Sequence, residues 1–379
     1  MALTNEMLKS AHDAALKKIT KNMAKYPLDF PTSAAEGGKY GHSENHGWTI
    51  SFWTGMLWLA YELTGEEKYK ACAMAHMPSY RERYDKRYCL DDHDIGFIYT
   101  LASTAGYKIT GDEVLRKLSL DAASLLAARF REKGQFIQLA SDENGPKEYY
   151  RLIIDCLMNI HLLYWAGEQT GNKEYTRKAY AHFCTTMETV IRDDGSTFQN
   201  FYFDPATGAR LGGGTKQGFS DNSCWSRGQS WGVLGIPLTY DRMKNDDIID
   251  TYYKVADYYL DHLPQDKVAF WDLCFTDGDK EPRDSSAAAI GVCGLLEACR
   301  VMPLDESHRE RYKKAAEDIM ESLIASYTTK DDPESDGILA HGTYYYAGGL
   351  GIDECNIWGD YFFVEALTRF LKPDWKKYW

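Results

Sequence analysis

A repeated pairing of two helical patterns is the feature that most limits how this chain can fold. In three successive copies, an almost wholly apolar segment ends at a Thr-Gly turn and a segment with a charged face follows; the turns are Thr64-Gly65, Thr110-Gly111 and Thr170-Gly171. A helix that is apolar nearly all round must be buried on every side, whereas a helix with one apolar stripe covers it from outside. The repeat therefore predicts helical hairpins, each with one inner and one outer helix.

The second half of the chain keeps this alternation without the Thr-Gly turn. Three more apolar segments occur, WSRGQSWGVLGIPLTYDRM, SSAAAIGVCGLLEAC and IWGDYFFVEALTRFL, and the N-terminal segment from Met7 to Met23 supplies an amphipathic partner for the last of them. Six apolar and six amphipathic helices predict an all-α fold, an (α/α)6 barrel or six-hairpin toroid, that spans residues 1–379 as a single catalytic domain. An open α-solenoid is the alternative, but solenoid units keep a stricter length than the connections of this chain.

The long connections of the chain lead into the predicted inner helices. They are rich in glycine and aromatic residues and cover residues 30–48, 131–150, 195–225, 264–284 and 337–357. In a closed ring the inner helices run the same way and present their N-termini at one mouth. Because binding and catalytic residues gather on loops that a rigid scaffold holds, we expect the functional site at this loop-built mouth.

Composition limits the partners and the compartment. A net charge of −13 argues against nucleic acid or an anionic membrane as the main partner. No apolar run approaches the roughly 20 residues that span a bilayer, and the N-terminal residues lack the apolar core of a signal peptide. The nine cysteines are scattered and form no CxxC pair, which fits reduced thiols better than a disulfide or zinc framework. We expect a cytoplasmic protein, monomeric or homodimeric, without a metal site.

Polar residues that open the predicted inner helices are far apart in sequence and converge at the mouth if the ring closes: Asp94, Asp155, Arg227 and Asp284. Asp155 lies among apolar side chains in LIIDCLMN, where a carboxylate is costly to bury without a role. The structural alternative is a helix N-cap, a position that favours Asp. This alternative fits Asp284, which precedes two serines, particularly well.

Two carboxyl groups in one apolar cavity are suited to acid–base chemistry on sugars. Their mutual repulsion raises one pKa, so one group stays protonated as a general acid while the other stays charged. Arg227 stands near Trp225 and Trp231, so its planar guanidinium can hold a carboxylate while the indoles stack on a ring. Helix N-termini add positive potential at the same mouth. This combination predicts an anionic sugar as the ligand.

Six motifs extend in order over nearly the whole chain: DHDIGF, IIDCLMN, FYFDPATG, QGFSDNSCWSRGQSWG, EPRDSSAAA and DECNIWGDYFFVEAL. Together they resemble the unsaturated glucuronyl hydrolases, glycoside hydrolase family 88. The resemblance implies an (α/α)6 barrel without a metal or organic cofactor. It also implies removal of 4,5-unsaturated glucuronic acid from the non-reducing end of lyase-generated oligosaccharides of the glycosaminoglycan type.

The resemblance implies a chemical role for each acid. Asp155 would protonate C4 of the double bond and assist the addition of water at C5, after which the hemiketal opens and expels the aglycone. Asp94 would hold the sugar hydroxyls at C2 and C3. His93 adjoins Asp94 and is expected at the sugar as well. The implied stacking and polar contacts to the sugar are Trp48, Trp231, Gln217 and Arg227.

Departures from the family pattern bear on the substrate. Gln199, a candidate sugar contact, stands where a histidine is expected; glutamine hydrogen-bonds but cannot titrate near neutrality. Leu139-Ala140-Ser141 replaces an aromatic residue, which weakens a predicted wall of the pocket. Sulfate-tolerant members place Ser and Lys before their equivalent of GIDE, and this chain has instead Tyr345, Gly348 and Leu350. We therefore expect sulfated disaccharides to be poor substrates.

Other functions fit part of the pattern. An unsaturated rhamnogalacturonyl hydrolase shares the barrel and differs in the sugar next to the scissile bond. A glycosidase for saturated sugars would use a similar pair of acids. A helical-repeat scaffold that binds peptides would need no buried aspartates. Unsaturated glucuronyl and unsaturated rhamnogalacturonyl hydrolases both hydrate a conjugated double bond. Loss of the ultraviolet absorbance of this bond therefore separates these two functions from the glycosidase for saturated sugars and from the scaffold.

Overall fold

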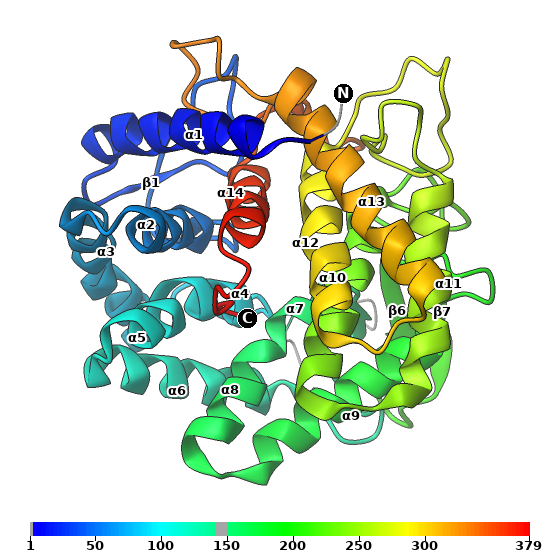
Figure 1. The fold of residues 1–379 in the computed structure, drawn as a ribbon. Helices are drawn as coiled ribbons and strands as arrows, with labels where there is room; N and C mark the ends of the chain where they lie inside the picture. The colour runs from blue at the N-terminus through cyan, green and yellow to red at the C-terminus, as the bar shows by residue number, and fades with distance from the viewer. Residues whose placement is uncertain (1–2, 141–149) are drawn as a thin grey trace.

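The computed structural model describes residues 3–140 and 150–379. In this part of the chain the inner ring has six members (Figure 1), namely α2 (Ile50–Thr64), α4 (Ile95–Tyr99) continued by the π-helical turn η1 (Thr100–Thr104) and α5 (Ala105–Thr110), α7 (Cys156–Asn159) with α8 (His161–Thr170), α10 (Ser226–Met243), α12 (Ser285–Val301) and α14 (Ile357–Leu371). Each member packs against the next, and α14 packs against α2. The ring is therefore closed, which confirms the predicted (α/α)6 barrel and excludes the open solenoid.

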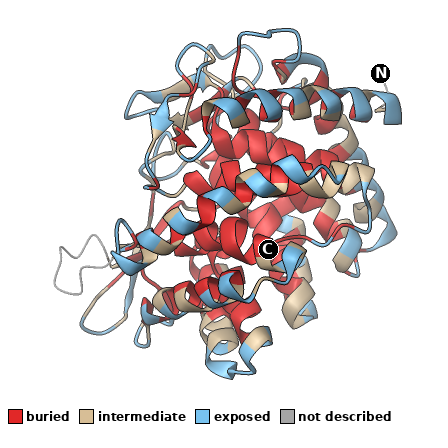
Figure 2. Ribbon diagram, turned by 90° about the vertical axis from the view of Figure 1, so that its left-hand side faces the viewer, coloured by how far each residue is buried: buried red, intermediate tan, exposed pale blue. Residues whose placement is uncertain are grey.

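Amphipathic helices cover this ring from outside. They are α1 (Asn5–Lys25), α3 (Glu67–Asp85), α6 (Glu113–Ala128), α9 (Lys173–Thr189), α11 (Ile249–Asp261), preceded by the 3-10 turn η3 (Asp246–Ile248), and α13 (Glu306–Ser322), continued by the π-helical turn η4 (Leu323–Tyr327). Figure 2 shows the difference in burial: the inner helices are buried almost throughout, whereas the outer helices are buried along one stripe. The two patterns read from the sequence are thus the two rings of the structure.

The repeated Thr-Gly turn ends three inner helices in one way. The threonine hydroxyl donates to the carbonyl oxygen four residues earlier and accepts from the backbone N–H two residues later. The glycine has a positive φ of 70–72°, a left-handed conformation that costs glycine little: Gly65, Gly111 and Gly171. These turns lie at the end of the barrel opposite the mouth, because they close inner helices rather than open them.

Short antiparallel strands occur in the connections between the helices. They pair as β1 (Phe30–Pro31) with β2 (His42–Ser43), β3 (Phe130–Arg131) with β4 (Phe136–Ile137), β5 (Arg151–Ile153) with β6 (Asn200–Phe203) and β7 (Arg210–Gly214), and β8 (Gly342–Tyr345) with β9 (Leu350–Glu354). The strands stiffen the loops from which the mouth is built. No helix in the described residues is long and apolar enough to cross a membrane.

Candidate active site

Asp94 and Asp155 come together because two inner helices touch where they begin. Asp94 precedes α4 and Asp155 precedes α7, and both occupy the N-cap position. Gly96 lets the two backbones meet, since a Cβ built on it would lie 2.3 Å from the Cα of Asn159. A larger residue at Gly96 would push α4 away from α7 and separate the two carboxyl groups. We call Asp94 and Asp155 the acid pair.

His93 lies against both members of the acid pair. Its Nε2 is 3.5 Å from Asp94 Oδ1, 3.4 Å from Asp155 Oδ1 and 3.7 Å from Asp92 Oδ1. The residue is 1% exposed, and neither ring nitrogen has a hydrogen-bond partner among the described residues. Burial lowers the pKa of His93 well below its usual range, so the imidazole is neutral. His93 is thus a buried neighbour of both acids, and its contact with a sugar stays a prediction.

Both acids are recessed, and their surroundings favour the protonated form. The side chains of Asp94 and Asp155 are 17% and 21% exposed. Burial raises the pKa of Asp155 to about 7; the charge of Asp92 acts in the same direction and that of Arg227 opposes it. Burial, and then repulsion from Asp92 and Asp155, raises the pKa of Asp94 well above its usual range. The acid pair therefore holds a transferable proton near neutral pH, as a general acid requires.

The N-cap explanation accounts for Asp284 and not for the acid pair. Asp284 Oδ1 accepts hydrogen bonds from the backbone N–H and the hydroxyl of Ser286, at 3.1 and 2.5 Å. The side chains of Asp94 and Asp155 make no capping hydrogen bond to their own helices. Two recessed carboxyl groups that do not cap their own helices are available for another purpose.

Asn159 is a residue of the site that sequence reasoning missed. Its Oδ1 accepts from the backbone N–H of Phe97 at 2.6 Å, and its Nδ2 donates to Asp94 Oδ1 and to the backbone oxygen of Asp155, both at 3.4 Å. One buried amide therefore links the first turns of α4 and α7 to the acid pair. The signal in the sequence was a polar residue one helical turn after Asp155 in an apolar helix.

The residues around His93 have the spacing of a metal site. The ligand atoms of Asp92, His93 and Asp94 all lie within 4.8 Å of one another. A bound cation would need the two carboxyl groups deprotonated. Burial raises the pKa of Asp92 to about 6 and raises that of Asp94 well above its usual range, which favours protons over a metal ion here.

Arg227 already holds a carboxylate, one of the protein itself. Its Nη1 donates to Asp284 Oδ2 and to the backbone oxygen of Thr343, both at 2.6 Å, and its Nη2 donates to the backbone oxygen of Tyr344 at 2.7 Å. The guanidinium lies over the ring of Trp225, 4.5 Å from its centroid. Arg227 thus fastens β8 to the start of α10, and its contact with a sugar stays a prediction.

Gln199 shapes the loop that carries Gln217. Its Oε1 accepts from the Thr215 hydroxyl and from the backbone N–H groups of Lys216 and Gln217, at 3.1, 2.6 and 2.8 Å. Its Nε2 donates to Gln217 Oε1 at 2.8 Å, and Gln217 Nε2 in turn donates to the backbone oxygen of Tyr344 at 3.1 Å. An amide supplies the donor and the acceptor that this arrangement needs. Sugar contacts of both glutamines stay predictions.

The two predicted stacking residues lie at different depths. Trp48 is half-buried, and its Nε1 donates to the hydroxyl of Tyr344 at 3.1 Å. Trp231 is 1% exposed and packs between Phe97 and Phe362, with both ring centroids 5.4 Å away. Trp48 can therefore meet a ligand at the mouth, whereas Trp231 belongs to the core beneath it, and its stacking role stays a prediction.

The segment that lacks the expected aromatic residue runs beside the acid loop. The backbone oxygen of Leu139 accepts from the N–H of His93 at 3.0 Å, and Ala140 forms an antiparallel bridge with Asp92. Ser141 lies outside the described residues. Ala140 itself brings only a methyl group to this segment.

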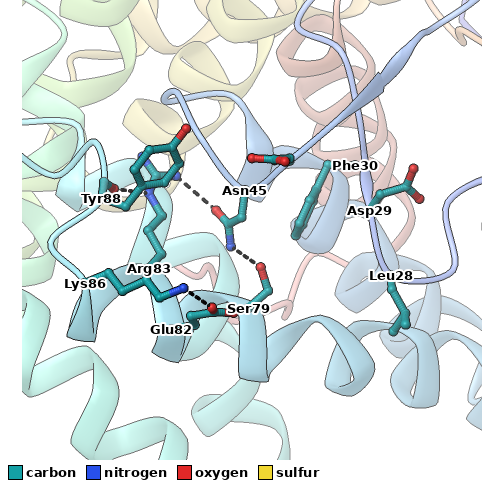
Figure 3. A pocket seen from close by; sticks show the side chains of 10 residues that line it. Leu28, Asp29, Phe30, Asn45, Ser79, Glu82, Arg83, Lys86 and Tyr88 are labelled. Carbon is teal, nitrogen blue, oxygen red and sulfur yellow. Dashed lines mark hydrogen bonds and ion pairs between the residues drawn. The ribbon is translucent and has the colours of Figure 1, made fainter.

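A cleft of about 590 Å³ adjoins the loops that lead into α2 and α4 (Figure 3). It holds the buried Arg83 of α3, which donates to the Asn45 side chain and to the backbone oxygens of Gly47, Tyr88 and Cys89 at 2.8–3.2 Å. One guanidinium therefore clamps both loops. The first loop ends at the predicted stacking residue, and the second continues into the acid pair.

A helical toroid whose mouth holds two recessed carboxyl groups and a transferable proton defines an acid-catalysed carbohydrate hydrolase. The profile of Glycosyl Hydrolase Family 88 matches residues 18–346. The chain belongs to this family, as the six motifs predicted, and the protein is a hydrolase.

Similar proteins cover the whole chain. The unsaturated chondroitin disaccharide hydrolase of Streptococcus pneumoniae is 46% identical over 100% of this chain and 95% of its own. The crystal structure of unsaturated glucuronyl hydrolase from Streptococcus agalactiae has a TM-score of 0.97 and 45% identity, with 100% of this chain and 95% of that chain covered. A structure of a variant of that enzyme complexed with dGlcA-GalNAc6S has a TM-score of 0.89 and 42% identity, with 100% and 95% covered.

Proposed function

We propose that the protein removes 4,5-unsaturated glucuronic acid from the non-reducing end of glycosaminoglycan-type oligosaccharides released by polysaccharide lyases. The observation that carries the proposal is the acid pair around His93, with a proton available near neutral pH at the mouth of the barrel. The names of the similar proteins support the same substrate class.

The reaction is hydration of a vinyl ether, followed by ring opening. Asp155 gives its proton to C4, and water adds at C5 while its own proton passes to the Asp155 carboxylate. The product is a hemiketal at C5, which opens by breaking the bond from C5 to the ring oxygen. The hemiacetal left at C1 then expels the aglycone, and Asp155 ends the cycle protonated.

Asp94 accepts hydrogen bonds from the hydroxyls at C2 and C3, and the neighbouring charge that helps to keep the pKa of Asp155 high is that of Asp92. His93 is neutral and places a ring nitrogen against both acids without adding charge. Trp48 stacks on the sugar, and Gln217 contacts it from the opposite loop. The groups that bind and the group that protonates thus come from connections that lead into different inner helices.

Loss of the ultraviolet absorbance of the conjugated double bond tests the proposal. An unsaturated, unsulfated chondroitin disaccharide should lose this absorbance on incubation with the enzyme. Unsaturated rhamnogalacturonan disaccharide and saturated glucuronides should react more slowly or not at all. Faster turnover of the rhamnogalacturonan substrate would move the assignment to the rhamnogalacturonyl hydrolases, and turnover of saturated glycosides would replace hydration by direct hydrolysis.

We further propose that sulfated disaccharides are poor substrates. The hairpin tip between β8 and β9 carries Tyr345, whose ring lies over Gly348, and an exposed Leu350. Neither Tyr345, Gly348 nor Leu350 offers a cation that could pair with a sulfate. Comparable turnover of 6-sulfated and unsulfated chondroitin disaccharides would contradict this.

We place the reaction in the cytoplasm. All nine cysteines lie in the described part of the chain, and all are free thiols, which suits a reducing compartment. Fractionation of the source cells would test the location, and sedimentation would separate the monomer from the homodimer.

A further inference from the structure

Four aromatic rings gather at the mouth, on three of the loops that lead into inner helices. Tyr346 stacks on Trp271, with centroids 4.4 Å apart and planes 11° from parallel. Phe219 packs edge-on against Phe275 and Trp271, at 5.2 and 6.3 Å. We call these four residues the aromatic platform. They come from three separate connections, each of which leads into an inner helix.

The aromatic platform is separate from the hydrophobic core. Phe219 is 61% exposed and Tyr346 37%, whereas Trp271 is buried at 3%; within the described residues none of the four rings belongs to the main cluster of core residues. The part of an aromatic ring that stays in contact with water does not contribute to the stability of the fold. A contiguous patch of this kind marks a surface that a ligand covers.

Hydrogen bonds hold the platform in place before any ligand binds. The backbone N–H of Phe219 donates to Asp272 Oδ2 at 2.9 Å, and Trp271 Nε1 donates to Glu281 Oε2 at 2.9 Å. The backbone oxygen of Trp271 accepts from the N–H of Ser226, the first residue of α10, at 3.2 Å. A surface that is ordered in advance loses little entropy on binding.

The platform lies one step further out than the predicted sugar contacts. Gln217 Nε2 donates to the backbone oxygen of Tyr344, and the hydroxyl of Tyr344 accepts from Trp48 Nε1, both at 3.1 Å. Phe219 follows Gln217 by two residues and Tyr346 follows Tyr344 by two, which is at most about 7 Å of chain. The sugar that reaches the platform is therefore the one bonded to the unsaturated uronate.

We propose that the aromatic platform binds the first aglycone sugar, which lays the C–H face of its pyranose ring on Phe219 and Tyr346. The inference rests on the proposed function and adds the group that recognises the aglycone. Aromatic rings hold such a face through dispersion and their electron-rich surface. The carboxylates of Asp272 and Glu281 at the base of the platform favour a ring without sulfate or other anionic groups.

Two substrates with one reacting sugar test the proposal. The first is the unsaturated, unsulfated chondroitin disaccharide, and the second is the methyl glycoside of 4,5-unsaturated glucuronic acid, which lacks the aglycone ring. Phe219→Ala should raise KM for the disaccharide ~3- to 10-fold, the loss expected for one stacked pair, and leave kcat nearly unchanged. KM for the methyl glycoside should stay at the wild-type value. Phe219→Trp should restore the disaccharide KM.

Val114→Ala is the matched control, because Val114 is an exposed apolar residue at the start of the outer helix α6, at the other end of the barrel. Should Phe219→Ala fail to fold, Tyr346→Ala serves the same comparison. An equal rise in KM for both substrates, or no rise for either, would overturn the inference. Wild-type enzyme that turns over neither substrate would instead overturn the proposed function.

Discussion

Asp155 becomes a proton donor near neutral pH through its surroundings and not through its own chemistry. Burial and the neighbouring charge of Asp92 raise its pKa to about 7, although Arg227 is close enough to oppose them. Arg227 shares its charge with Asp284, whose carboxylate lies 2.6 Å away. The buried Arg227–Asp284 pair thus supports the loops of the mouth while it leaves the acid pair short of a counter-charge.

Asp155→Asn should lower kcat by roughly 10²–10⁴-fold, since an amide gives up no proton. The same variant should be more stable than the wild type at pH 8. The pKa of Asp155 is higher in the folded than in the unfolded chain, so wild-type stability falls as pH rises from about 4 to about 7, and asparagine carries no buried charge. Thermal unfolding at pH 5 and pH 8, alongside kinetics, measures both effects.

Asp91→Asn is the control for this prediction, because Asp91 is an exposed acid on the neighbouring loop before α4, paired with Arg129. It should leave kcat and the pH dependence of stability close to wild type. A stability gain for Asp155→Asn that is equal at pH 5 and pH 8 would show that burial of its charge is not the cause.

His93→Leu should move the alkaline limb of the kcat profile to higher pH. The three carboxylate oxygens around Nε2 favour the tautomer with hydrogen on that nitrogen, and an N–H there stabilises the ionised acids. Its removal raises the pKa of the acid pair further, so the proton donor survives to higher pH. In the wild type we expect kcat to begin to fall near pH 7, since the pKa of Asp155 is about 7. A limb that stays in place, or moves down, contradicts this role for His93.

At the scale of the helices, the acid pair depends on one contact between α4 and α7. The repeat in the sequence predicted that Asp94 and Asp155 open neighbouring inner helices, and it therefore predicted that they meet. It did not predict which residues bring the two helices into contact, because no periodic pattern distinguishes Gly96 or Asn159 from other small or polar residues in a helix. Backbone approach at Gly96 and a bridging amide at Asn159 are properties of the packed pair.

Gly96→Ala should weaken both the fold and the reaction. The new methyl group would meet backbone atoms of Asn159 at 2.3 Å, and backbone cannot move aside as a flexible side chain can. Overpacking of this kind costs about 1–3 kcal/mol or more of unfolding free energy. An acid displaced by about 1 Å costs ~10²-fold in kcat/KM. Gly232→Ala is the control on another inner helix, where the nearest atom is a side-chain methyl of Val255 at 3.2 Å.

Arg83→Met should lower kcat/KM by about tenfold or more although Arg83 touches no sugar, because a small misplacement of both mouth loops suffices. The substitution leaves backbone oxygens of both loops without their donor, so the melting temperature falls as well. In Arg83→Ala the cleft of Figure 3 opens onto the vacated space, and added guanidinium ion should restore part of the activity. Arg81→Ala, an exposed arginine on the same helix, is the control. If guanidinium leaves the activity of Arg83→Ala unchanged, the guanidinium group of Arg83 does not support activity by holding the two loops.

At the scale of the molecule, the sequence predicted the inner and the outer ring of helices. It did not predict the strand pairs at the mouth or the packing of residues 372–379 at the other end. Helices follow from local periodicity, and the closed ring follows from their number. The strand pair of β5 with β6 joins residues some fifty positions apart, and each strand has four residues or fewer. A local sequence pattern therefore does not predict this pair. The same holds for residues 372–379, whose packing against the far end of the inner ring depends on five different helices.

Trp379→Ala tests whether this far end carries stability separately from the chemistry at the mouth. The fully buried indole stacks on Phe362 with planes 8° from parallel, meets the edge of Phe97 at 5.8 Å, and donates from Nε1 to Glu365 at 2.9 Å. Its loss should cost about 3–5 kcal/mol of unfolding free energy. The acid pair is positioned by α4, α7 and their loops, so kcat at a temperature where the variant is folded should stay within a few-fold of wild type. Trp375→Ala, at the edge of the same segment, should cost less. A large fall in kcat with an unchanged melting temperature would contradict this separation. It would mean that Trp379 positions the acid pair through its contact with Phe97 of α4.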